Sequence, residues 1–252
     1  MEIIMIPRDR VLSKLDSLLQ SNDYAGAKRL LEYWLSESEY SRDGHGILLM
    51  LNELMGLSRK LGEKEKAIGY AEKALAQIEN MGIAENVGAA TTYLNSATVF
   101  KAFGDPERSI KLFVKAKAIY ERDLSPTDDR LGGLYNNMGL TLVDLRKFRE
   151  AEELYLKAIS VMEATEGKEP EEAITYLNMA SAAEAELGAD NARDKISALL
   201  KKAAERMDIG KDRTDGNYAF ICEKCATVFG YYGNEDYARE LKERCRRIYE
   251  GN

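Results

Sequence analysis

Residues 135–158, with the sequence YNNMGLTLVDLRKFREAEELYLKA, contain two amphipathic segments on either side of a short polar break. Each segment places apolar or small residues on one stripe: Tyr135, Met138, Gly139 and Leu142 in the first, and Phe148, Ala151, Leu154, Tyr155 and Ala158 in the second. This i, i+3, i+4, i+7 spacing predicts two helices. The small residues Gly139, Ala151 and Ala158 are expected where the two backbones approach closely. The stretch therefore predicts a helix pair with a turn at Arg146-Lys147.

The same pattern recurs at intervals of 42 residues. The small residues of the second helix recur as Ala67, Ser109 and Ala151, and again as Ala74, Ala116 and Ala158. Gly62 and Gly104 occupy the turn position that Arg146 occupies in the opening stretch. Self-similarity at a fixed period predicts an array of repeated helix pairs.

Weaker copies of the pattern extend the array over nearly the whole chain. We expect an all-α protein with about six antiparallel helix pairs in a single domain of residues 8–250. The repeat units are expected at about 8–40, 45–82, 84–123, 126–166, 169–208 and 213–250. Residues 41–46, SRDGHG, read as a flexible connection in which His45 is a solvated loop residue.

These helix pairs resemble the tetratricopeptide repeat. The familiar repeat has about 34 residues, and the longer spacing seen here is similar to that of kinesin light chain-type repeats. The resemblance implies a right-handed α-solenoid superhelix with a concave groove lined by the first helix of each pair. It also implies a non-enzymatic scaffold that binds a protein or peptide in this groove.

Three asparagines follow the aromatic residue of the first-helix stripe by two positions: Asn95, Asn137 and Asn178. Asparagine is an unfavourable residue inside a helix, costing several tenths of a kcal/mol relative to alanine. In the resembled family such amides hydrogen-bond the backbone of a bound peptide, and we predict these three as peptide-binding residues. The alternative is that they bond to neighbouring helices and only fix the repeat geometry.

Cationic residues near the ends of two first helices are further candidates. Arg59 and Lys101 could contact an acidic peptide or its terminal carboxylate, or they could be solvated residues favoured by the helix dipole. The two-carboxylate clamp of chaperone-binding members is not expected here, because Glu53 occupies the matching position in the second unit.

Composition argues against several partners and cofactors. The net charge of −7 without a clustered basic surface predicts no nucleic-acid binding. No segment approaches the roughly 20 apolar residues of a membrane span, so we expect no membrane contact and a cytoplasmic location. The three cysteines, Cys222, Cys225 and Cys245, fall on apolar stripe positions and are expected to be core residues. A Cys222/Cys225 zinc site is the weaker alternative, and no metal or cofactor is expected.

The sequence contains no phosphate-binding glycine loop and no hydrolase or metalloprotease motif, so we expect no enzyme. Besides the scaffold, two functions stay open. One is a regulatory sensor that changes the pitch of the superhelix when a peptide binds. The other is an array that associates with itself. We expect a monomer or a weak homo-oligomer.

Overall fold

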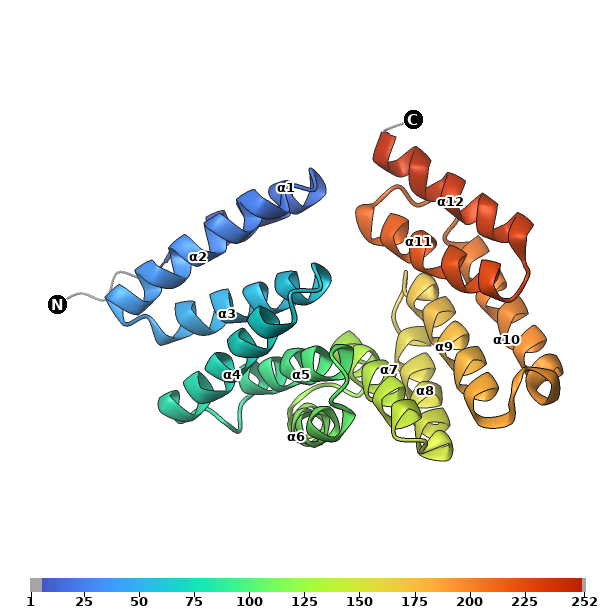
Figure 1. The fold of residues 1–252 in the computed structure, drawn as a ribbon, viewed down its shortest axis with the longest axis horizontal. Coiled ribbons are helices and arrows are strands. Elements are labelled where there is room, and N and C mark those ends of the chain that lie inside the picture. The colour runs from blue at the N-terminus through green and yellow to red at the C-terminus, as the bar shows by residue number, and fades with distance from the viewer. Residues whose placement is uncertain (1–5, 251–252) are drawn as a thin grey trace. The chain divides into compact units, whose positions relative to one another are not determined.

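The computed structural model describes residues 6–250, and this part of the chain forms twelve helices and no strands (Figure 1). Consecutive helices form six antiparallel pairs, which confirms the predicted all-α repeat fold. The helices are α1 (Arg8–Gln20), α2 (Tyr24–Ser41), α3 (Gly44–Lys60), α4 (Lys64–Met81), α5 (Val87–Ala102), α6 (Pro106–Asp123), α7 (Asp129–Asp144), α8 (Phe148–Glu163), α9 (Glu169–Leu187), α10 (Ala189–Ile209), α11 (Gly216–Tyr231) and α12 (Glu235–Glu250).

The chain divides into two compact units, residues 1–123 and residues 124–252. In the first unit α1 packs on α2, α3 on α4 and α5 on α6, and the pairs are joined by contacts of α2 with α3 and of α4 with α5. In the second unit α7 packs on α8, α9 on α10 and α11 on α12, and α8 also packs on α9. First helices of adjacent pairs touch as well: α3 with α5, α7 with α9, and α9 with α11.

The turn inside each pair contains one residue with positive φ. These residues are Asn22, Gly62, Gly104, Arg146, Gly188 and Gly233. Arg146 has φ of 58°, in the left-handed region that glycine adopts more readily. The alignment of Arg146 with Gly62 and Gly104 therefore reflects a shared backbone conformation, which Arg146 adopts despite its Cβ.

Short polar side chains begin several of the helices. Asp23, Asn86 and Asp215 each accept a hydrogen bond from the backbone N–H three residues later. Such caps satisfy amide groups that have no partner within the helix. Because most connections are only a few residues long and are capped, each helix is held antiparallel to the previous one.

The connection between α2 and α3 is shorter than the sequence predicted. α2 continues to Ser41 and α3 begins at Gly44, so the expected flexible segment is wrong. Asp43 is buried and accepts a hydrogen bond from the Gly46 N–H at 2.9 Å, which starts the helix early. His45 is exposed, as expected, but lies in the first helical turn.

The predicted small residues lie at the closest helix contacts. Ala67, Ala151 and Ala158 are fully buried, as are the equivalent Ser109, Ala74 and Ala116. A Cβ on Gly139 of α7 would lie only 2.7 Å from Cε1 of Tyr155 on α8. Since Tyr155 is itself fully buried, glycine lets its ring lie directly against the α7 backbone.

The C-terminal pair corrects one expectation. Cys222 and Cys225 are buried core residues, but Cys245 on α12 is only partly buried. Arg244 of the same helix is 5% exposed despite its charge. Its Nη1 donates to the Met207 carbonyl oxygen at 3.2 Å and to the Tyr218 hydroxyl at 3.1 Å, and Nη2 contacts Asp208 at 2.7 Å. These bonds tie α12 to α10 and α11.

The only tryptophan of the chain, Trp34, lies in α2 of the first unit. Its side chain is partly buried, and the Tyr33 ring contacts it edge-on with 5.2 Å between ring centroids.

Candidate functional site

Asparagine side chains link the first helices of adjacent repeats in the first unit. Asn95 of α5 donates from Nδ2 to Oδ1 of Asn52 on α3 at 2.8 Å. Asn52 in turn donates to the Thr92 hydroxyl at 2.9 Å and to the Leu48 carbonyl at 2.8 Å. The Asn52 amide is thereby fixed in one orientation, and it holds the Asn95 amide at the boundary of the two helices.

The second unit repeats this arrangement with one change of position. Asn178 of α9 donates from Nδ2 to Oδ1 of Asn136 on α7 at 3.0 Å. Asn137 donates instead to the Gly133 carbonyl of its own helix at 2.9 Å. The residue that pairs with Asn178 is therefore Asn136, the neighbour of the predicted Asn137.

Sequence reasoning missed Asn52 and Asn136, although a signal was present. Each stands one residue after its stripe-opening residue, Leu51 or Tyr135, and 42 or 43 residues before its partner. Successive helix residues are rotated by about 100°. A shift of one position therefore decides whether an amide contacts the next first helix or its own helix.

The linked amides keep hydrogen-bonding capacity. Oδ1 of Asn95 and of Asn178 accepts no hydrogen bond from residues 6–250, and the same holds for Oδ1 of Asn137. All three side chains are partly exposed. An asparagine amide offers two N–H donors and a carbonyl acceptor. Each of these side chains can therefore accept a hydrogen bond from an added chain without losing its present one.

The two predicted cations lie further along the same helices of the first unit. Arg59 is exposed in the last turn of α3, and Lys101 is partly buried in the last turn of α5. They lie six to seven residues beyond Asn95 and Asn52, or about 10 Å along the helix axes. Within residues 6–250 the three predicted asparagines bond to Asn52, Gly133 and Asn136 and not to one another.

Glu53 gives this face a carboxylate in the first unit. The side chain is partly buried on α3, and burial raises its pKa, with a further increase from the negative charge of Asp16 on α1. The position that a two-carboxylate clamp needs as a neutral or basic residue therefore carries a carboxyl group in this chain.

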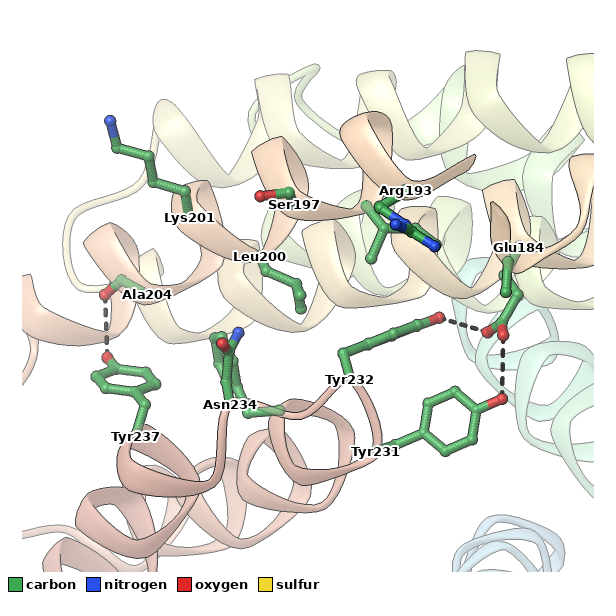
Figure 2. Close-up of a pocket in the computed structure, with 13 residues that line it drawn as sticks. Glu184, Arg193, Ser197, Leu200, Lys201, Ala204, Tyr231, Tyr232, Asn234 and Tyr237 are labelled. Carbon is green, nitrogen blue, oxygen red and sulfur yellow. Dashed lines mark hydrogen bonds between the residues drawn. The ribbon is translucent and has the colours of Figure 1, made fainter. Parts of the chain in front are cut away.

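A cavity of about 800 Å³ lies in the second unit beside α10. Its floor is apolar, and its opposite wall comes from the end of α11, the following turn and the start of α12 (Figure 2). The hydroxyls of Tyr231 and Tyr232 both donate to Glu184, at 3.1 and 2.8 Å, and Figure 2 shows them converging on that carboxylate. The Tyr237 hydroxyl lies 2.8 Å from Asp208 Oδ1 and 3.1 Å from the Ala204 carbonyl oxygen, and its proton can be donated to either acceptor. These bonds fix the aromatic wall.

The cysteine thiols are unsuited to nucleophilic chemistry. Burial raises the pKa of Cys222 to about 11 and also raises that of Cys225. The thiolate is the reactive form, and these shifts keep both groups protonated near neutral pH. No group of three or more metal-ligating side chains lies together within residues 6–250. Among the same residues, no helix is both long enough and apolar enough to cross a membrane.

One part of the chain matches a known family model. Residues 132–172, which include the helix pair of residues 135–158, match the model of the tetratricopeptide repeat. A search of curated protein sequences finds no match.

Several solved structures share the fold. BtubC (BKLC) from P. vanneervenii is 20% identical over 81% of each chain, with a TM-score of 0.69. A structure from Podosopora anserina, described as a kinesin light chain with nearly identical TPR-like repeats, is 17% identical over 80% of this chain and 94% of its own, with a TM-score of 0.55. A Rap protein complexed with Competence and Sporulation Factor is 14% identical over 94% of this chain and 73% of its own, also with a TM-score of 0.55.

Proposed function

Given this tetratricopeptide-type fold, we propose that the chain is a non-enzymatic scaffold whose first helices bind extended segments of a partner protein. In the first unit Asn95 hydrogen-bonds the backbone of the bound segment, and Arg59 and Lys101 contact its acidic groups. In the second unit Asn137 and Asn178 hydrogen-bond the backbone.

The observation that carries this proposal is the unused capacity of the linked asparagines. Asn95 and Asn178 are each oriented by a bond to a neighbouring helix, at 2.8 and 3.0 Å, while Oδ1 still accepts nothing from residues 6–250. A peptide backbone presents N–H donors that such an oxygen can accept. Because the amides are already fixed, a ligand loses less entropy in ordering them.

A purely structural role for the asparagines accounts for the two interhelical bonds but not for Asn137. That side chain bonds only to its own helix, and alanine is the better helix former at such a position. Asn137 therefore separates the two roles: replacing it should leave the repeat geometry intact and weaken partner binding.

The test compares pull-downs from the source cell with wild-type protein and with an Asn95/Asn137/Asn178→Ala variant. We expect the triple variant to lose most of its captured partners, while Asn137→Ala alone loses part and keeps its thermal stability. Asn191→Ala is the matched control, because Asn191 is exposed in the first turn of α10 and its amide bonds only to the Leu187 carbonyl at the end of α9. Equal recovery of the same partners by wild type and triple variant would show that the asparagines serve only the repeat geometry.

A regulatory sensor is the alternative function, and the Rap protein solved with a bound factor has the same type of fold. The two functions differ in shape change. X-ray scattering of the protein with a recovered partner peptide separates them, since a sensor changes its radius of gyration on binding and a static scaffold does not. A third candidate function is a self-associating array. Light scattering during gel filtration without peptide tests it, because the molar mass shows whether copies of the chain associate.

A further inference from the structure

The cavity beside α10 exists because one helix contact is missing. In the other pairs of each unit, the second helix packs on the next first helix: α2 on α3, α4 on α5 and α8 on α9. The α10 and α11 backbones do not approach in this way. Contacts between them are concentrated near the end of α10, where Met207 receives hydrogen bonds from Tyr218 and Cys225. Along the earlier turns of α10 the cavity takes the place of a packed helix.

The side of α10 that lines this cavity carries two parallel stripes, of which the apolar one is largely buried. Ile196, Leu200 and Ala204 repeat every four residues and form an apolar stripe. Beside them Arg193, Ser197 and Lys201 repeat with the same spacing and are all exposed. Eight residues of helix separate the two cations by about 12 Å along the axis. An occupant of the cavity thus meets an apolar surface and a basic edge together.

The facing wall is aromatic and contributes no cation. Phe229 is buried and contacts Tyr237 edge-on at 4.8 Å, and Tyr231 is 71% exposed with its ring against Tyr232 at 4.9 Å. A ring so exposed beside an apolar floor is typical of interaction sites.

The charges around the cavity favour an anionic occupant. Glu184 is the only carboxylate in the lining, and the Tyr231 and Tyr232 hydroxyls occupy its two oxygens. Arg193 is paired with Asp190 at 2.8 Å, but both side chains are largely exposed and such pairs contribute little. Lys201 has no ion pair with any side chain of residues 6–250, and its flexible stem can turn toward a ligand.

We propose that this cavity is a second docking site, distinct from the asparagine positions on the first helices, and that it binds an acidic segment of a partner protein carrying a bulky apolar side chain. The apolar side chain enters between the Ile196/Leu200 stripe and the aromatic wall. Acidic residues next to it contact Arg193 and Lys201 at the rim.

Two synthetic peptides of equal length test the proposal, each with two leucines at the centre and four charged residues around them. One carries glutamates and the other lysines, and binding is followed by fluorescence anisotropy of an attached dye. We expect the acidic peptide to bind at least about 10-fold more tightly than the basic one. Raising the salt concentration should reduce the difference, because rim charges are screened.

Variants locate the site. Arg193→Glu/Lys201→Glu should reduce the affinity for the acidic peptide by about 10-fold or more. Tyr231→Ala should reduce the affinity for both peptides. Arg239→Glu/Lys242→Glu is the matched control, since both residues are exposed cations on α12 outside the cavity lining. All of these side chains are exposed, so the variants should fold normally, which circular dichroism checks.

Three results would overturn the proposal. They are equal affinity for the two peptides, no binding of either peptide below about 1 mM, and wild-type affinity of the Arg193→Glu/Lys201→Glu variant for the acidic peptide. The Asn95/Asn137/Asn178→Ala variant should bind the acidic peptide like wild type. The second site and the proposed function can therefore fail independently.

Discussion

Replacing Gly139 by alanine tests the closest helix contact of the second unit. The new Cβ would lie 2.7 Å from Cε1 of Tyr155 and 3.0 Å from Cδ1 and Cζ of the same ring. Carbon atoms prefer about 3.5 Å or more, so the ring or the helix must move by at least roughly 0.8 Å. Tyr155 is fully buried, which leaves little space for that movement.

The expected magnitude follows from two opposing effects. Overpacking of a core costs about 1–3 kcal/mol, and replacing glycine by alanine inside a helix contributes about 1 kcal/mol of stability. Gly139→Ala should therefore lower the free energy of unfolding by up to about 2 kcal/mol. Gly133 is the matched control in the same helix, because a Cβ there meets no atom within 4 Å. Gly133→Ala should raise stability by up to about 1 kcal/mol.

Urea denaturation followed by far-ultraviolet circular dichroism measures both variants against wild type. Repeat arrays can unfold in several steps, so the comparison uses the shift of the whole curve for each variant under identical conditions. The two variants should shift in opposite directions. If Gly139→Ala stabilises the protein as much as Gly133→Ala does, the close approach of α7 to the Tyr155 ring is not rigid and the reasoning fails.

Three further predictions concern single side chains. Arg146→Gly should be about 1 kcal/mol more stable than Arg146→Ala, since only the alanine keeps a Cβ at a positive φ of 58°; thermal unfolding of both variants compares them. Arg244→Met should lower the free energy of unfolding by about 3 kcal/mol, because the buried Tyr218 hydroxyl and Met207 carbonyl each lose one hydrogen-bond partner. Arg247→Met, on the exposed side of α12, should change the denaturation midpoint little. Burial raises the pKa of Glu172 to about 7, outweighing the attraction of Arg206. The folded state therefore holds this proton more tightly than the unfolded state does. The stability that comes from this difference is complete below pH 4.5 and is lost as the pH rises through 7. The advantage of Glu172→Gln over wild type in urea titrations should thus grow by up to about 3 kcal/mol between pH 5 and pH 8, and a constant difference would contradict the shift.

The Glu172 environment explains the direction of that shift. The side chain is 3% exposed, and Arg206 Nε lies 2.8 Å from its Oε2. The N–H does not point at this oxygen, which has no hydrogen-bond partner in the described chain. Glu163, Glu169 and Glu171 add negative charge around it. A close but poorly aligned guanidinium therefore compensates only part of the cost of a buried charge.

The fold could be predicted from the sequence because its evidence is local and repeated. Stripe spacing, buried small residues and turn positions recur every 42 residues, and each copy supports the others. The early start of α3 was missed because Asp43 reads as a loop residue until its cap to Gly46 is seen.

The candidate site could be predicted less well from the sequence, because it depends on contacts between repeats. Asn136 and Asn137 are adjacent and chemically identical, and only the position of α9 decides which of them bonds to Asn178. The cavity beside α10 has no sequence signal at all. It arises from the absence of packing between two helices whose individual patterns are ordinary.

Trp34 is a natural fluorescent probe of the first unit. As the only tryptophan, it lies in α2, so its emission reports on residues 1–123 alone. Helical dichroism, in contrast, sums over both units. Recording the two signals during one denaturation therefore compares the cooperativity of the first unit with that of the whole array, without an introduced label.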